Sequence, residues 1–392
     1  MKDIDIYFEP VDLDLSKYDE ETNNFFVGNL IDPYTAAGQF PDLEEVKIAL
    51  FGVKEDRKAL KNTGCAHAPD KVREQLYPLL SHWNNIKIAD LGNIRQGNSI
   101  EDTYFAVKEV VTILLHEKIL PIIIGGSQDL TYANYLAYEN IGRVINIATI
   151  DPVFDLGQEE EELNAHSYLS RIILHQPNFL FNYTNIGYQS YFVNRDALQL
   201  MKNLFFEINR LGNVRADIAE TEPMIRSADM VSFDISAIRS ADAPGSYYAG
   251  PNGLNGEEAC RICRYAGMND KLTSIGFYEF NPQYDHRHQT AQLVAQMIWY
   301  FLDGYANRQN DIPGKRNKDF IRFRVYLDDY KEELFFLKSK KTDRWWIEIP
   351  VKSKAGKKQL KYPYTPCSYA DYQQALNQEL PDRWWKLQQK LM

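Results

Sequence analysis

The sequence contains little cysteine, with four residues in a chain of 392. So few cysteines exclude a disulfide framework and are typical of a reducing compartment, so we expect a cytoplasmic protein. No apolar run approaches the ~18 residues of a membrane-spanning helix, and the first residues lack the basic and apolar regions of a secretory signal. Positive charge is also scarce, because 54 Asp and Glu outnumber 44 Lys and Arg and leave a net charge of −10. An acidic chain argues against nonspecific nucleic-acid binding, which requires basic surface.

Two of the cysteines, Cys260 and Cys263, form an isolated CxxC pair. Redox or zinc chemistry would need a second pair, or a thiol exposed at a helix N-terminus. The same spacing places both side chains on one face of an amphipathic helix. We therefore predict that both are buried and pack as small hydrophobic residues.

Apolar, β-rich runs alternate with helical patterns along most of the chain. The predicted strands are residues 47–53, 86–92, 120–126, 144–150, 180–187, 230–235 and 272–280, with a weaker candidate at 213–217. Helical patterns between them include residues 102–118 and 195–212. Several strands are apolar on both faces, as expected for a sheet that helices cover on both sides. This alternation predicts an α/β fold with a parallel, doubly wound sheet.

Acidic segments follow four of these strands. They are GGSQD at 125–129, DPVFD at 151–155, FDISAIR at 233–239 and EFNP at 279–282. In open α/β sheets, ligands bind beyond the carboxyl ends of the strands. Acidic residues also cap helices at such junctions, but their accumulation from four strands at one edge favours a functional cleft.

The character of the chain changes after about Asn310. A polar break at 311–320 precedes three predicted antiparallel strands, at 320–327, 332–341 and 344–354, and a helix near 371–380. We therefore predict a main domain of residues 1–310 and a basic, aromatic-rich C-terminal extension of residues 311–392. The segment from Lys315 to Lys361 is basic, and the tetrapeptide DRWW occurs at 343–346 and at 382–385. We expect the tryptophans to pack the extension against the main domain; the alternatives are a partner surface or, more weakly, a nucleic-acid surface.

The motifs at the strand ends resemble those of the ureohydrolase superfamily, which includes arginase, agmatinase and formimidoylglutamase. The resemblance runs from about Val46 to about Tyr305 and rests on the order of CAHAPDKVREQL, GGSQD, DPVFD, LNAHSYLSR, SFDIS and EFNP. The segment NIGYQSYFV looks closest to the formimidoylglutamase branch. The resemblance implies a three-layer α/β/α sandwich with a mostly parallel, arginase-like sheet, to which the small α+β extension is added. It also implies a homo-oligomer.

Active members of this superfamily hold two manganese ions, which activate water for attack on a guanidinium or formimino carbon. By resemblance, the metal ligands that remain in this chain are Asp151, Asp155 and Asp234. The three other ligand positions carry residues that bind metal weakly or not at all: Gln128, Val153 and Ser236. We therefore expect loss of the two-ion site and favour the absence of any cofactor. The alternative is one divalent cation, Mn²⁺, Mg²⁺ or Ca²⁺, on the three carboxylates.

The resemblance assigns roles to three more residues. His166 matches the histidine that shuttles protons in the family, and Glu279 matches the glutamate that holds the cationic head of the substrate. Arg239 stands at a family aspartate position, and we predict that its charge replaces the metal beside the three aspartates, which would otherwise repel one another. The alternative for Arg239 is an exposed arginine. The later segment YDHRHQT, at 284–290, is expected to be a polar lead into a helix.

Three functions are compatible with these observations. The first, which we favour from sequence, is an arginase- or formimidoylglutamase-like protein that has lost dinuclear catalysis and acts in binding or assembly, because loss of one ligand can cost a metal site its function. The second is an active hydrolase of the C–N bond of a small guanidino or formimino compound, with a single or atypical metal. The third is an interaction protein that acts through its C-terminal extension.

Overall fold

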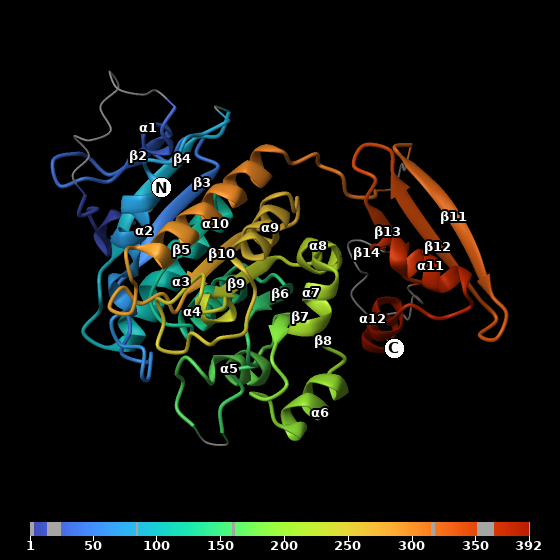
Figure 1. The fold of residues 1–392 in the computed structure, drawn as a ribbon. Helices are drawn as coiled ribbons and strands as arrows, with labels where there is room; N and C mark the ends of the chain where they lie inside the picture. Colours follow the sequence, from blue (N-terminus) through green and yellow to red (C-terminus); the bar gives the residue numbers. More distant parts are fainter. Residues whose placement is uncertain are drawn as a thin grey trace.

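The structure is a computed structural model that describes residues 4–13, 25–83, 85–158, 161–314, 318–350 and 364–391. A ten-stranded sheet forms the middle layer of the main body, and a separate four-stranded sheet lies at the C-terminal end (Figure 1). No helix in the described part of the chain is long and apolar enough to cross a membrane.

The main sheet is almost entirely parallel. Its order is β1-β4-β3-β5-β10-β9-β6-β7-β8, with β2 also paired to β4. The pairings are parallel except that of β1 with β4. The strands are β1 Phe8–Glu9, β2 Ile31–Pro33, β3 Ile48–Val53, β4 Ile88–Ile94, β5 Leu120–Ile124, β6 Ile145–Ile150, β7 Leu180–Tyr188, β8 Glu207–Arg210, β9 Met230–Asp234 and β10 Ser274–Tyr278. The predicted parallel α/β sheet is confirmed.

Helices cover both faces of this sheet. Alternate residues of each central strand point to opposite faces, and both sets are apolar, so both faces need to be buried. In β3, Ile48 and Leu50 join one core cluster, whereas Ala49 and Phe51 join the other. The helices of the main body are α1 Val27–Leu30, α2 Ala68–Leu76, α3 Ile100–His116, α4 Leu130–Asn140, α5 Tyr168–Leu174, α6 Arg195–Asn203, α7 Leu211–Ala216, α8 Thr221–Arg226, α9 Gly256–Gly267 and α10 Gln289–Ala306. Residues of α2, α9 and α10 fill the first cluster, and residues of α3 and α4 fill the second.

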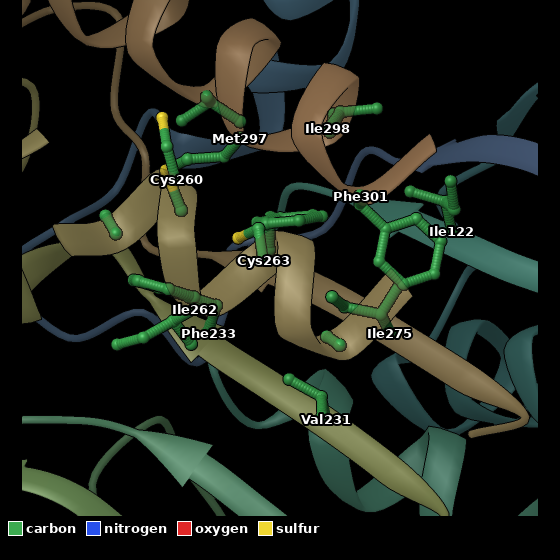
Figure 2. Packing of buried hydrophobic residues seen from close by; sticks show 14 of the residues in the cluster. Ile122, Val231, Phe233, Cys260, Ile262, Cys263, Ile275, Met297, Ile298 and Phe301 are labelled. Atoms are coloured by element: carbon green, nitrogen blue, oxygen red, sulfur yellow. The ribbon is translucent and has the colours of Figure 1, made fainter. Parts of the chain in front are cut away.

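The CxxC pair lies within the first of these clusters. Figure 2 shows Cys260 and Cys263 on α9 among Met297, Ile298 and Phe301 of α10. Both thiols are free and buried, and burial raises the pKa of Cys260 to about 12. The prediction of structural packing is confirmed, since a buried, protonated thiol is a poor ligand and nucleophile.

Two sequence predictions fail in the stretch between β7 and β9. The helix predicted for 195–212 ends at Asn203, and the strand β8, Glu207–Arg210, begins four residues later. The strand considered at 213–217 is instead the helix α7. Pairing of β8 with β7 at the edge of the sheet overrides the helical pattern of its sequence.

The segment YDHRHQT, at 284–290, leads into α10 as predicted, and its last two residues, Gln289 and Thr290, already belong to the helix. Asp285 accepts hydrogen bonds from the backbone N–H groups of Thr290 and Ala291, at 2.8 and 3.0 Å. A carboxylate that satisfies free N–H groups in the first turn stabilises the start of a helix. The segment is therefore a helix start.

The C-terminal extension has its own antiparallel sheet, ordered β11-β12-β13-β14. Its elements are β11 Phe320–Leu327, β12 Glu332–Ser339, β13 Trp345–Glu348, β14 Tyr364–Cys367, α11 Tyr369–Leu376 and α12 Asp382–Leu391. The three predicted strands and the first helix are present, whereas β14 and α12 were not predicted. Of the basic segment from Lys315 to Lys361, residues 315–317 and 351–361 lie outside the described part of the chain.

In each DRWW tetrapeptide, one tryptophan packs inside the extension and the other contacts the main body. The first of each pair, Trp345 and Trp384, is buried in the core of the extension. The second of each pair meets the main body: the ring of Trp346 lies 4.3 Å from the Arg226 guanidinium, and that of Trp385 lies 5.6 Å from Phe205. Packing against the main body is thus confirmed for Trp346 and Trp385.

Candidate metal and substrate site

Three aspartates meet at the carboxyl ends of two neighbouring strands, β6 and β9. Asp151 and Asp155 follow β6, and Asp234 ends β9. Each offers one carboxylate oxygen, and the three oxygens lie within 4.8 Å of one another. The exposed fractions are 0% for Asp151, 5% for Asp155 and 4% for Asp234. The sheet topology therefore brings together the aspartates that the sequence analysis singled out.

Local turns fix how two of these carboxylates lie. Asp151 accepts a hydrogen bond from the N–H of Val153 at 2.8 Å, and Asp234 accepts one from the N–H of Ser236 at 2.6 Å. Each bond occupies one oxygen, in the manner of an Asx turn. The second oxygen of Asp151 and one oxygen of Asp155 are buried without a hydrogen-bond partner among the described residues. Buried oxygens without partners are costly, and either a shared proton or a cation between the carboxylates would relieve that cost.

Burial and mutual repulsion disfavour ionisation of the cluster. Burial, followed by the charge of Asp155, raises the pKa of Asp151 well above its usual range, and burial raises that of Asp155 similarly. The pKa of Asp234 rises to about 7 through burial and the charge of Asp151. Without a cation, such a cluster retains protons near neutral pH, and a bound divalent cation would displace them.

Glu279 lies beside the aspartates at the end of β10. One of its carboxylate oxygens accepts a hydrogen bond from the N–H of Gln128, and the other accepts one from Asn62 Nδ2, both at 2.8 Å. Burial and the charge of Asp234 raise the pKa of Glu279 to about 8. The position is suited to a cationic ligand group, which would stabilise the ionised carboxylate.

His166 borders the same cluster from the segment that precedes α5. Its Nδ1 lies 3.0 Å from a carboxylate oxygen of Asp155, and its ring meets the ring of Tyr248 edge to face at 4.7 Å. About a third of its side chain is exposed. The carboxylate fixes the orientation of the imidazole, as outer partners of functional histidines commonly do.

Backbone strain is also concentrated here. Asp155 and Glu279 adopt left-handed backbone conformations, with φ of 48° and 65°. For residues other than glycine this conformation costs of order 1–3 kcal/mol and persists where the surroundings enforce it. Strain of this kind is often found at functional sites.

Gln128, Val153 and Ser236, where loss of metal ligands is predicted from the sequence, carry no imidazole. Gln128 is buried, and its Nε2 donates to Ser232 Oγ at 2.9 Å, while its Oε1 has no partner among the described residues. The aliphatic side chain of Val153 has no atom that can bind a metal ion. Ser236 is buried next to Asp234. The three carboxylates form an all-oxygen set of the kind that a hard divalent cation prefers.

The prediction that Arg239 pairs with the three aspartates is wrong. Its Nε donates to Asp242 at 3.0 Å, and 39% of its side chain is exposed. The carboxylate three residues ahead is a closer partner than the cluster. The basic side chain whose charge favours ionisation of Asp151 and Asp234 is His166.

Asn62 and Tyr248 contact the site, but neither is predicted from the sequence. Asn62 reaches Glu279 across 217 residues of sequence. The residues of the segment KNTG that contains it match no motif of metal or acid–base chemistry. No signal in one sequence could have revealed this contact.

Comparison with known proteins places the chain in a family. The sequence model of the Arginase family matches residues 46–303, about two thirds of the chain. The chain belongs to the Arginase family. Among similar curated proteins, formimidoylglutamase of Streptococcus gordonii is 26% identical over 305 residues, which are 71% of this chain and 89% of that protein. Formimidoylglutamase of Clostridium tetani is 24% identical over 271 residues, 64% of this chain and 79% of that protein.

Solved structures share the fold. Formimidoylglutamase of Bacillus subtilis matches with a TM-score of 0.65 and 19% identity, over 75% of this chain and 98% of that one. Trypanosoma cruzi formiminoglutamase with Mn²⁺ matches with a TM-score of 0.64 and 21% identity, over 70% and 97%. The predicted arginase-like fold and the resemblance to formimidoylglutamases are confirmed. The prediction that no cofactor is present is wrong, because a protein with this family fold holds Mn²⁺.

Proposed function

We propose that this Arginase-family protein hydrolyses the C–N bond of a small linear amidine or guanidine compound with one divalent cation held by Asp151, Asp155 and Asp234. The observation that carries the proposal is the group of three buried carboxylates, whose nearest oxygens lie within 4.8 Å. Buried carboxylates require positive charge, and Arg239 does not supply it. The formimidoylglutamase relatives and the solved Mn²⁺-containing formiminoglutamase support this substrate class.

A divalent cation at this position would act as a Lewis acid and lower the pKa of water enough to provide a nucleophile at neutral pH. Glu279 would accept hydrogen bonds from the planar amidinium or guanidinium group, because its carboxylate is already fixed by Gln128 and Asn62. This fixed geometry orients the carbon that is attacked.

His166 would manage the protons of the reaction. If its Nδ1–H donates to Asp155, its Nε2 is the basic nitrogen that can accept a proton and return it to the leaving amine. The exposed fraction of the ring gives this nitrogen access to water. The roles are therefore divided, since Glu279 binds the ligand, the aspartates hold the cation and His166 transfers protons.

A second candidate is a protein that binds the cation and a small ligand but does not turn the ligand over. Val153 favours this candidate, because an aliphatic side chain stands where the resembling enzymes have an imidazole. The pairing of Gln128 Nε2 with Ser232 favours it also, since the residue is engaged in the core. A single cation would then stabilise the site without a complete catalytic set.

Metal content and product release distinguish the two candidates. Protein stripped with a chelator is loaded with Mn²⁺, Mg²⁺ or Ca²⁺, and bound metal is measured by elemental analysis. Release of formamide, ammonia or urea is followed with formiminoglutamate, agmatine and arginine. We expect a single cation per chain and metal-dependent turnover of one of these compounds.

Variants locate the activity. Asp151→Asn and Asp234→Asn should lose cation binding and turnover, because each removes a charged ligand. Asp196→Asn, the same change on the exposed start of α6, should behave as the unmodified protein. A cation bound without turnover of any compound supports the second candidate, and two cations per chain would refute the single-cation site.

A further inference from the structure

Asn62 connects three distant segments at the candidate site. It is fully buried in the loop between β3 and α2. Its Nδ2 donates to the Glu279 carboxylate at 2.8 Å and to the Glu279 carbonyl at 3.0 Å. Its Oδ1 accepts from the N–H of Tyr247 at 2.9 Å and from Asn281 Nδ2 at 3.2 Å. Both donors and both acceptor sites of the amide are used.

These partners fix which way the amide lies. In the reverse orientation, Oδ1 would face the carboxylate and carbonyl oxygens of Glu279. Nδ2 would at the same time face the N–H of Tyr247 and the Nδ2 of Asn281. All four contacts would be repulsive, so the hydrogen-bond network determines a single orientation.

The amide restrains Glu279 at two points. The backbone of Glu279 is left-handed, with φ of 65°. Asn62 donates hydrogen bonds to both the carbonyl and the carboxylate of Glu279. A strained conformation persists only where neighbouring groups enforce it. The two bonds from Asn62 supply part of that restraint, and the N–H of Gln128 supplies another part.

The same loop also restrains the aromatic segment beside His166. The backbone N–H of Lys61 donates to the hydroxyl of Tyr248 at 3.4 Å, and Asn62 fixes the backbone of Tyr247. The ring of Tyr248 packs edge to face on the ring of His166. Movement of Asn62 would therefore disturb both the carboxylate of Glu279 and the packing of Tyr248 against His166.

We propose that Asn62 is a positioning residue that locks Glu279 and the Tyr247–Tyr248 segment together, so that the site accepts a planar amidinium-type cation in one orientation. This inference rests on the proposed function, because it assumes that Glu279 binds the cationic head of the ligand. Asn62 itself touches neither the three aspartates nor the ligand. Its substitution should weaken ligand binding and leave the metal content unchanged.

The test measures binding separately from turnover. The metal-loaded protein is titrated with acetamidinium, a minimal amidinium probe, and its dissociation constant is measured by NMR. Asn62→Leu keeps the size of the side chain and removes its hydrogen bonds. We expect the dissociation constant to rise roughly tenfold or more, as for loss of hydrogen bonds to a charged group.

A matched variant controls for simple loss of stability. Asn269 is equally buried and donates to the carbonyls of Ile225 and Ala228, away from the site. Asn269→Leu should lower the stability but leave acetamidinium binding unchanged. If Asn62→Leu does not fold, Asn62→Ser, which retains one polar group, should show a smaller loss of binding.

The outcomes separate this inference from the proposed function. Unchanged acetamidinium binding in the Asn62 variants overturns the positioning role, even if the protein is an active hydrolase. Weakened binding in a protein that hydrolyses none of the compounds supports the positioning role and refutes the hydrolase. An unmodified protein that does not bind acetamidinium overturns the inference, because no head-group site would exist for Asn62 to position.

Discussion

Asp234 and Glu279 are carboxyl groups whose pKa values, about 7 and about 8, are raised by burial and by neighbouring carboxylates. In an unfolded chain the same groups titrate near pH 4. The folded state therefore binds protons more tightly, and the free energy of unfolding falls as pH rises from about 4 to about 8. The slope is at most about 1.4 kcal/mol per pH unit for each proton. We expect the melting temperature of chelator-treated protein to fall across this range.

A divalent cation should reduce this pH dependence, because it replaces the protons as the source of positive charge. Asp234→Asn should make the slope in chelator shallower, since one titrating group is removed. Asp196→Asn should leave the slope as it is. Thermal unfolding at about pH 5, 6.5 and 8, with and without cation, tests this; a flat profile in chelator would contradict it.

Much of the site was accessible from sequence because it follows from topology. Acidic residues at the ends of parallel strands must share one edge of the sheet, so Asp151, Asp234 and Glu279 could be brought together from the sequence alone. The ion pair of Arg239 with Asp242 could not be predicted in this way. The carboxylate three residues away competes with a cluster that only the fold creates. Asn62 could not be found either, since its contacts cross 217 residues.

At the scale of elements, the two DRWW tetrapeptides act as matched anchors. Arg344 lies 3.0 Å from Glu222 of α8, and Arg383 lies 3.3 Å from Glu207 of β8. Glu222 is shared with Arg226, and both of its arginine partners are almost fully buried. An arginine and the second tryptophan of each tetrapeptide thus hold the extension to the main body.

Glu222→Gln should therefore be strongly destabilising. It leaves two buried guanidinium groups without their shared carboxylate, and loss of one partner from a buried ion pair costs about 3–5 kcal/mol. Glu348→Gln is the matched control, because Glu348 pairs with the exposed Arg322 within the extension. That change should cost at most about 1 kcal/mol. Chemical denaturation measures both, and equal effects would contradict the anchoring role.

The elements that sequence predicted well are those whose pattern and tertiary context agree. Strands such as β3 and β5 are apolar on both faces and are buried on both faces. The strand β8 was mistaken for helix because residues 195–212 have a continuous helical pattern, and only its pairing with β7 decides otherwise. The repeated DRWW was visible, but one sequence does not reveal which glutamates it meets.

At the scale of the whole molecule, we propose that residues 1–310 and 311–392 are separate units, as the sequence predicts. The core clusters of the main body contain no residue beyond Ala306 in the described chain, and the cluster of the extension begins at Phe323. The location in the cytoplasm and the homo-oligomer stay predictions. The third function, an interaction role for the extension, also stays a prediction.

A chain that ends at Asn310 tests this division. Its main cores are intact, so it should fold and bind the divalent cation with unchanged stoichiometry. It should also melt at a lower temperature, because Arg226 loses its bonds to the carbonyls of Trp345 and Cys367 and its stacking on Trp346. Removal of the extension exposes Arg226 to water, so each lost hydrogen bond should cost its net value, about 0.5–1.5 kcal/mol. If the shortened chain is unfolded by circular dichroism, the extension is part of one cooperative domain and the separate-unit proposal fails.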